Sequence, residues 1–102
     1  MNFEGKVVMI TGAAGSLGKA VAAAFAQSGA AQVLVDISEP ALQAAYPGSD
    51  AKRLLAATDL LDAASVARTV DTALAKFGRI DALCNIAGGF TMGTPVHATP
   101  DA

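Results

Sequence analysis

Three regularly spaced glycines stand near the start of the chain, at Gly12, Gly15 and Gly18. A glycine directly after a strand allows the backbone to turn sharply, and small residues around it let the backbone approach a ligand closely. Free N–H groups at the start of the following helix, together with the helix dipole, favour a phosphate at that place. Residues 11–18, the glycine-rich turn, are therefore predicted to hold the pyrophosphate of a dinucleotide cofactor.

The phosphate loop of nucleoside triphosphatases is the main alternative for such a turn. That loop needs a glycine, four residues, and then Gly-Lys followed by Ser or Thr. In this chain Gly12 and the pair Gly18-Lys19 are one residue too far apart. Ala20 also stands where a magnesium-binding hydroxyl is needed, so the spacing excludes a triphosphatase loop.

An acidic residue, Asp36, follows the second apolar run of the chain. A carboxylate at the end of the second strand can accept hydrogen bonds from the ribose hydroxyls of an adenosine. The same charge repels a 2′-phosphate, and Ile37, Ser38 and Glu39 supply no cation to offset that repulsion. The sequence therefore predicts NAD(H) as the cofactor in preference to NADP(H).

The elements that must position these residues follow from apolar runs and helix signals. Apolar runs predict strands at 6–10, at 32–35 with Asp36 at the end, at 52–57 and at 80–86. Helices are expected from Ser16 to a stop at Gly29, over 40–46, and over 62–77 with Asp62 as the cap. The expected apolar stripes of the two longer helices are Leu17, Val21 and Phe25 with Ala20 and Ala24, and then Val66, Val70, Ala73, Leu74 and Phe77.

Strands that alternate with helices predict a parallel sheet with helices on both faces. Right-handed crossovers, with two helices on one face and the 62–77 helix on the other, give the strand order 3-2-1-4. This is an α/β fold of the Rossmann type, the first half of a doubly wound sheet in three layers. The tail from 89 to 102 shows no clear period and is expected to be a loop.

Composition limits the remaining possibilities. Of the 102 residues 53% are hydrophobic, which is typical of a folded chain and not of a disordered one. The net charge is −2 and no basic block occurs, so neither nucleic acid nor an anionic membrane is an expected partner. The apolar run Val7–Ile10 is too short for a signal peptide or a membrane span, and the single cysteine, Cys84, fits a reducing compartment. A cytoplasmic protein is expected.

The combined motifs resemble those of the short-chain dehydrogenase/reductase family over residues 6–88. They comprise the glycine-rich turn, Asp36, Thr58-Asp59-Leu60, and Gly78-Arg79-Ile80-Asp81 leading to Asn85-Ile86-Ala87-Gly88. The resemblance implies that Asp59 binds the adenine amino group with Leu60 beside the ring, and that Asn85 braces the central strands. It also implies that Ala87 and Gly88 leave room for the ribose and nicotinamide. The predicted cofactor-binding residues are Gly12, Ala14, Gly15, Ser16, Leu17, Gly18, Asp36, Ile37, Asp59, Leu60, Asn85, Ala87 and Gly88.

One departure from the family pattern lies in the turn itself. The main subfamily has a glycine where this chain has Ser16, and the spacing of Gly12, Gly15 and Gly18 matches the longer epimerase-like subfamily. The 85–88 motif favours the main subfamily, although Ile86 replaces a second asparagine. Both subfamilies imply the same cofactor, whereas they differ in the reaction.

The family's catalytic serine and Tyr-x-x-x-Lys are missing. The only tyrosine, Tyr46, has Asp50 four positions later and is expected in a loop far from the switch point of the sheet. Cys84 is expected to be a small core residue, and the lone His97 does not make a metal site. No catalytic residue and no metal ligand is therefore predicted.

Residues 1–88 are thus expected to be a partial dinucleotide-binding domain, and 89–102 a tail leading into a missing second half. The intact relative would move hydride between NAD(H) and an alcohol or carbonyl compound, in a homo-oligomer. By itself the chain is expected to be inactive and to self-associate through its uncovered sheet edge. A short non-catalytic protein that binds a dinucleotide or a partner remains the alternative.

Overall fold

The computed structural model describes residues 2–86, in which strands and helices alternate. The strands are β1 (Val7–Thr11), β2 (Ala31–Asp36), β3 (Arg53–Ala57) and β4 (Ala82–Asn85). The helices are α1 (Ser16–Gln27), α2 (Glu39–Ala45) and α3 (Ala63–Phe77). The predicted order of elements is confirmed, and their ends differ from the prediction by one or two residues. The predicted tail lies outside the described residues.

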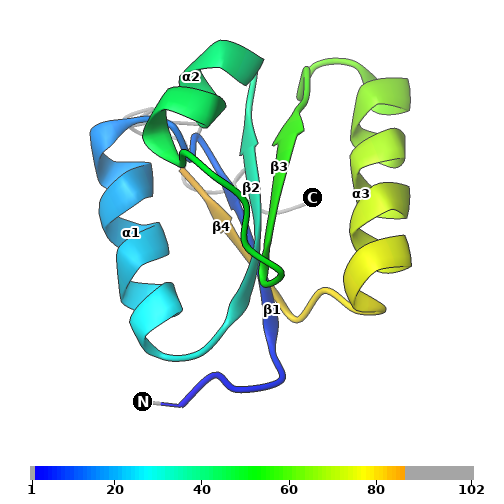
Figure 1. The fold of residues 1–102 in the computed structure, drawn as a ribbon. Coiled ribbons are helices and arrows are strands. Elements are labelled where there is room, and N and C mark those ends of the chain that lie inside the picture. The colour runs from blue at the N-terminus through cyan, green and yellow to red at the C-terminus, as the bar shows by residue number, and fades with distance from the viewer. Residues whose placement is uncertain (1, 87–102) are drawn as a thin grey trace, which may run out of the picture.

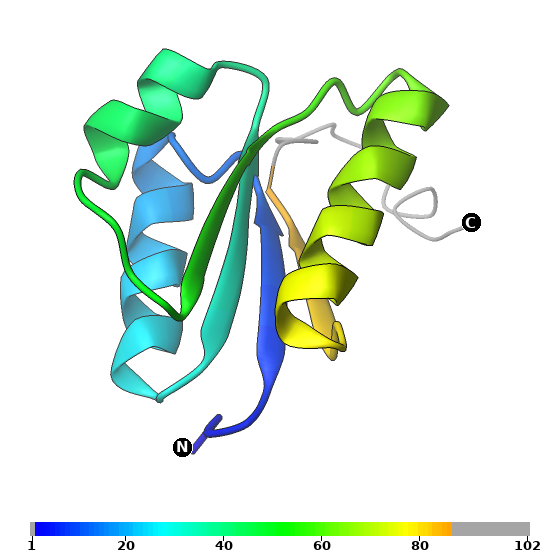
Figure 2. The same cartoon turned by 45° about the vertical axis from the view of Figure 1, so that its right-hand side comes forward.

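The four strands form one parallel sheet in the order β3-β2-β1-β4. β1 is central, with Val7 opposite Ala31 of β2 and Val8 opposite Ala82 of β4. Figure 1 shows α1 and α2 on one face of the sheet and α3 on the other, and Figure 2 shows the same three layers after a turn of 45°. The predicted Rossmann-type fold with order 3-2-1-4 is confirmed.

Each face of the sheet has its own apolar core, because neighbouring strand residues point to opposite faces. The core beneath α1 and α2 is built around Val8, Ile10, Leu34 and Leu42. The core beneath α3 is built around Val7, Val33, Val35 and Ala73. β1 and β2 are therefore buried on both faces, as their uninterrupted apolar runs predicted.

The buried face of α1 differs from the predicted stripe. Gly18 and Ala22 are its buried residues, while Val21 and Phe25 are only half-buried. Three residues of the predicted stripe are exposed: Leu17, Ala20 and Ala24. The stripe was wrong for these three because the smallest residues, which allow the helix to approach β1 closely, define the contact face.

The buried face of α3 also differs from the prediction. The buried positions are Ser65, Thr69 and Ala73, one turn apart along the helix. The predicted stripe is half-buried at most of its positions, and Leu74 is 43% exposed. Two hydroxyl groups therefore face the sheet where an apolar stripe was expected.

Asp81 fastens the start of β1 to the start of β4. Its Oδ2 accepts a hydrogen bond from the backbone N–H of Val7 at 2.8 Å, and its own N–H donates to Val7 O at 2.8 Å. Its Oδ1 accepts from the Arg79 guanidinium at 2.6 Å. The hydrogen bond from Arg79 has the largest effect on the pKa of the Asp81 carboxyl and lowers it, and the hydrogen bond from Val7 lowers it further. Because Arg79 and Asp81 make these contacts before the strand, β4 begins at Ala82 and not at the predicted residue 80.

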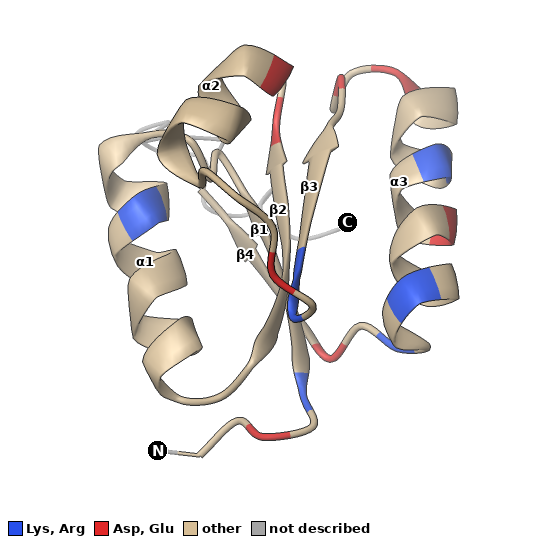
Figure 3. Cartoon of the chain, viewed as in Figure 1, with Lys and Arg blue, Asp and Glu red and all other residues tan. Residues whose placement is uncertain are grey.

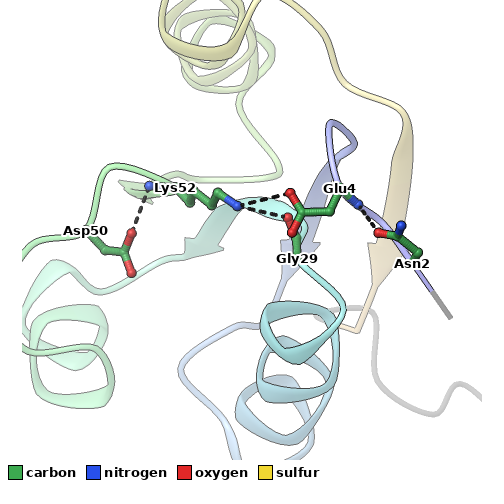
Figure 4. Close-up of polar contacts among 5 residues, drawn as sticks. All are labelled: Asn2, Glu4, Gly29, Asp50 and Lys52. Carbon is green, nitrogen blue, oxygen red and sulfur yellow. Dashed lines mark hydrogen bonds and ion pairs between the residues drawn. The ribbon is translucent and has the colours of Figure 1, made fainter.

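A second set of polar contacts closes the amino-terminal edge of the sheet (Figure 4). Lys52 Nζ lies 3.6 Å from Glu4 Oε1 and donates to Gly29 O at 3.4 Å. The backbone N–H of Lys52 donates to Asp50 Oδ1 at 2.9 Å, and that of Glu4 donates to Asn2 Oδ1 at 2.9 Å. These contacts join the segment before β1 to the α1–β2 and α2–β3 connections. They lie at the edge of the sheet opposite the carboxyl ends of the strands.

Candidate functional site at the carboxyl edge of the sheet

The glycine-rich turn leaves β1 at Gly12, whose φ is +70°. The next two amides are held by β2: Ala13 N donates to Val35 O at 3.0 Å, and Ala14 N donates to Asp36 Oδ2 at 3.0 Å. The turn is therefore fixed to the neighbouring strand before α1 begins. The left-handed φ at Gly12 explains why glycine is needed there.

The start of α1 differs from the starts of the other two helices. Ser38 caps α2 by accepting from Ala41 N, and Asp62 caps α3 by accepting from Ala64 N, as predicted for Asp62. The cap of α1 is Gly15, which makes no side-chain bond. The first amides of a helix have no partner inside it, so those of α1 face the carboxyl edge of the sheet ready for an anion.

Gly18 has a packing role. A Cβ at Gly18 would overlap the carbonyl oxygen of Gly12 and lie 2.8 Å from Ala13 Cα. At Gly15 a Cβ would lie 3.6 Å from Gly12 O, which is an ordinary contact. Gly18 is therefore required for the turn to pack on α1, whereas the fold does not require glycine at position 15.

Asp36 stands at the end of β2 and faces the turn. Its Oδ2 accepts from Ala14 N at 3.0 Å, and its Oδ1 accepts from Ile37 N at 2.8 Å. The Ile37 side chain is 66% exposed beside it. Each carboxylate oxygen retains a lone pair for a ligand hydroxyl.

The residues that follow β3 form the opposite wall of a cleft of about 400 Å³. Asp59 Oδ1 accepts from Leu61 N at 3.0 Å, and the side chain of Leu60 is 42% exposed. The cleft is lined by Gly12, Gly15, Asp36, Ile37, Thr58, Asp59 and Leu60. Six of these seven residues were predicted site residues, so the fold brings together segments far apart in the sequence.

The cleft lies at an acidic edge of the molecule. In Figure 3 acidic segments mark the end of β2, the start of α2 and the connection from β3 to α3, all at the same edge of the sheet. The carboxylates concerned are Asp36, Glu39, Asp59 and Asp62. A ligand with a further negative charge beside Asp36 would meet repulsion there.

Asn85 joins β4 to β1 at the same edge. The Thr11 hydroxyl donates to Asn85 Oδ1 at 2.7 Å, and the two residues are partners in the parallel ladder. This contact agrees with the bracing role that the family resemblance implied for Asn85. The other two predicted residues of this segment, Ala87 and Gly88, lie outside the described residues.

Tyr46 makes a contact that the sequence did not predict. Its hydroxyl donates to Ala13 O in the glycine-rich turn at 2.7 Å, and the Arg53 guanidinium lies 5.7 Å from its ring centroid. Burial, more than any nearby charge, raises the pKa of this phenol. Nothing in the sequence indicated this contact, because no local pattern signals that the end of α2 reaches the glycine-rich turn.

A second hollow of about 390 Å³ lies between α1 and the end of α2. Its lining includes three alanines of α1, Gln32, Tyr46 and Arg53, and it contains none of the predicted site residues. Gln32 Nε2 donates to Ala22 O at 3.0 Å, while its buried Oε1 makes no hydrogen bond with any residue in the range 2–86. The predicted site residues gather instead in the cleft at the carboxyl ends of the strands, which is where open α/β sheets bind ligands.

Among residues 2–86, no group of three or more acidic, cysteine or histidine side chains is arranged to hold a metal ion. Within that same range no helix has the length and hydropathy that crossing a bilayer requires.

The sequence is matched by the model of a known protein family. The family model of short chain dehydrogenases matches residues 6–102. The chain therefore belongs to the short-chain dehydrogenase family, as the motifs of the glycine-rich turn and of 78–88 predicted.

Two curated relatives show how much of a family member the chain represents. It is 43% identical over 88 residues to D-threitol dehydrogenase of Mycolicibacterium smegmatis, covering 83% of this chain and 34% of that protein. It is 42% identical over 90 residues to a CLA biosynthesis dehydrogenase/reductase of Lactiplantibacillus plantarum, covering 85% and 32%. The chain thus spans about a third of the length of these relatives.

Solved structures agree in fold and include dinucleotide complexes. The 3-ketoacyl-(acyl-carrier-protein) reductase of Brucella melitensis, complexed with NADH, matches with a TM-score of 0.74 at 36% identity, over 80% of this chain and 34% of that one. NAD⁺-bound xylitol dehydrogenase matches with 0.74 at 35%, over 81% and 33%. The N-domain of a bacterial malonyl-CoA reductase, solved with NADP, matches with 0.73 at 31%, over 79% and 16%.

Proposed function

We propose that this chain is the nicotinamide dinucleotide-binding part of an oxidoreductase, and that it binds NAD(H) in preference to NADP(H). The observation that carries the proposal is the cleft in which the uncapped start of α1 faces Asp36 on one wall and Asp59 on the other. Membership of the family and neighbours solved with NADH and NAD⁺ support the dinucleotide. Neighbours solved with NADP make the choice between the two cofactors the point to test.

Each wall of the cleft has its own part in the proposed binding mode. The pyrophosphate passes Gly12 and Gly15 and is held by the backbone amides at the start of α1. Asp36 accepts hydrogen bonds from the adenosine ribose, and Asp59 with Leu60 holds the adenine. The remaining proposed contacts are Ala14, Ser16, Leu17, Gly18, Ile37, Asn85, Ala87 and Gly88.

The nicotinamide, when bound, accepts or donates the hydride. The residues of this chain bind and orient the dinucleotide, and we propose no catalytic residue among them. The intact enzyme acts on an alcohol or carbonyl compound as a cytoplasmic homo-oligomer, and this chain alone does not turn over substrate.

Titration of the chain with NADH and NADPH, followed by nicotinamide fluorescence, tests the choice of cofactor. We expect Asp36→Asn to reduce the preference for NADH by roughly tenfold, equivalent to about 1.4 kcal/mol, because it removes the charge that repels the 2′-phosphate. Asp71→Asn is the matched control, since this exposed carboxylate lies in the middle of α3. Tighter binding of NADPH than of NADH by the unaltered chain would refute the preference.

A further inference from the structure

The buried polar side of α3 lies directly beneath one wall of the cleft. Ser65 and Thr69 are 9% and 7% exposed, one helical turn apart. The backbone N–H of Asp59 donates to Ser65 Oγ at 2.9 Å, and the hydroxyls of Thr58 and Thr69 lie 2.6 Å apart. Both buried hydroxyls of the helix therefore contact the segment that leaves β3.

The direction of the threonine pair follows from its neighbours. Thr58 Oγ1 donates its single proton to Ala56 O at 3.0 Å, so Thr69 must be the donor in the contact between the two hydroxyls. The backbone N–H of Thr58 donates to Asp36 O at 2.8 Å. Thr58 is thus bonded to Thr69 on one side and to the Asp36 wall of the cleft on the other.

The wall formed by Asp59 and Leu60 has little packing of its own. Leu60 is 42% exposed and Leu61 is 97% exposed. The other bonds of Asp59 are local: Leu61 N donates to its Oδ1 and Asp62 N to its carbonyl oxygen, both at 3.0 Å. Local bonds shape a turn but do not fix its position. Beyond the backbone bond from Thr58 N to Asp36 O, the position of Asp59 and Leu60 relative to β2 is set by the contacts with the two hydroxyls of α3.

From this arrangement we propose that Ser65 and Thr69 are positioning residues that set the Asp59–Leu60 wall and thereby the affinity for the adenosine half of the dinucleotide. The proposal rests on the proposed function and adds to it two residues that do not line the cleft. The hydroxyls hold Asp59 and Leu60 in the position that the ligand needs before it binds, so binding does not carry the entropic cost of ordering this wall. The phosphate-binding start of α1 lies on the other side of the cleft and is not affected.

The test measures the binding of NADH, AMP and inorganic pyrophosphate to the 102-residue chain and its variants. We expect Thr69→Val and Ser65→Ala to weaken AMP and NADH by roughly threefold to tenfold, the value of one hydrogen bond, while pyrophosphate affinity stays unchanged. Thr69→Ser, which keeps the hydroxyl, restores AMP binding. Thr72→Val is the matched control, since the Thr72 hydroxyl donates to Arg68 O at 2.8 Å on the exposed side of the same helix.

The outcomes separate positioning from general stability. A merely structural role would weaken AMP and pyrophosphate together, or lower the unfolding temperature without changing either affinity, and both results overturn the proposal. If Thr69→Val does not fold, Ser65→Ala decides, because it removes a single oxygen; retained AMP affinity in that variant overturns the proposal. Failure of the unaltered chain to bind either NADH or NADPH overturns the proposed function itself.

Discussion

Gly15 and Gly18 belong to one turn but are needed for different reasons. A Cβ at Gly18 would collide with the backbone of Gly12, so we expect Gly18→Ala to destabilise the chain by about 1–3 kcal/mol. Gly15 has a φ of −80° and room for a Cβ, so Gly15→Ala should leave the free energy of unfolding unchanged or slightly raised.

The two substitutions also differ in their effect on the proposed cofactor. We expect Gly15→Ala to weaken NADH binding by at least about tenfold, because the methyl group occupies the approach to the pyrophosphate. Urea unfolding and fluorescence titration of the same samples measure the two effects separately. Undiminished NADH affinity in Gly15→Ala would show that no ligand comes close to this residue.

Tyr46 supports the turn from the side of α2. Loss of its hydrogen bond to Ala13 O should make Tyr46→Phe less stable by about 0.5–1.5 kcal/mol in urea unfolding. The raised pKa adds a dependence on pH: the phenol stabilises the fold below its ordinary pKa of 10.0, and this contribution is lost as the pH rises through the higher folded value.

The pH dependence can be measured directly, because Tyr46 is the only tyrosine and the chain has no tryptophan. Absorbance of the phenolate in the folded chain should show a midpoint above 10.0. The gap in stability between the chain and Tyr46→Phe should shrink above that midpoint. A folded-state midpoint at or below 10.0 contradicts the contact.

Residues differ in how far the sequence predicts their roles. Asp36 was predicted because it follows an apolar strand whose carboxyl end lies beside the glycine-rich turn, whereas Asp59 was implied by the resemblance to the family. Tyr46, Ser65 and Thr69 were missed because their contacts join elements whose packing no local pattern encodes. The same limit explains the exposed Leu17, since Gly18 and Ala22, and not the larger apolar residues, form the buried face of α1.

At the scale of elements, the junction between β1 and β4 depends on one carboxylate. The lowered pKa of Asp81 means that its charged form stabilises the fold above its ordinary pKa of 3.8. This contribution is lost as the pH falls through the lower folded value. We therefore expect Asp81→Ala to lower the urea midpoint at neutral pH and to lose that difference in strong acid.

Asp71→Ala is the control for Asp81→Ala, since Asp71 is exposed on α3. The urea concentration at the unfolding midpoint of Asp71→Ala should equal that of the unaltered chain at every pH. A difference between Asp81→Ala and the unaltered chain that persists below the folded pKa would mean that packing, not the carboxylate, holds the junction.

Over the described part of the molecule, one stretch of exposed apolar surface lies beside β4. Leu83 is 59% exposed and, opposite Met9, faces the side of α3, where Leu74 is 43% exposed. β4 also has a free edge in the described sheet. We expect the chain to self-associate here, and Leu83→Lys to shift sedimentation towards the monomer.

Leu61→Lys is the control, since Leu61 is 97% exposed in the β3–α3 connection, away from β4. It should leave the sedimentation profile unchanged. A monomeric unaltered chain at all concentrations would contradict the predicted association, as would equal effects of the two lysine substitutions.

The strand order also sets the sequence of events during folding. β1 meets β2 after a single helix, whereas Thr11 and Asn85, which join β1 to β4, are 74 residues apart. Closing the longer loop costs more chain entropy, so we expect β4 to dock last. The glycine-rich turn and Asp36 belong to the earlier pairing, and a refolding chain would therefore form the glycine-rich side of its cleft before its fourth strand is in place.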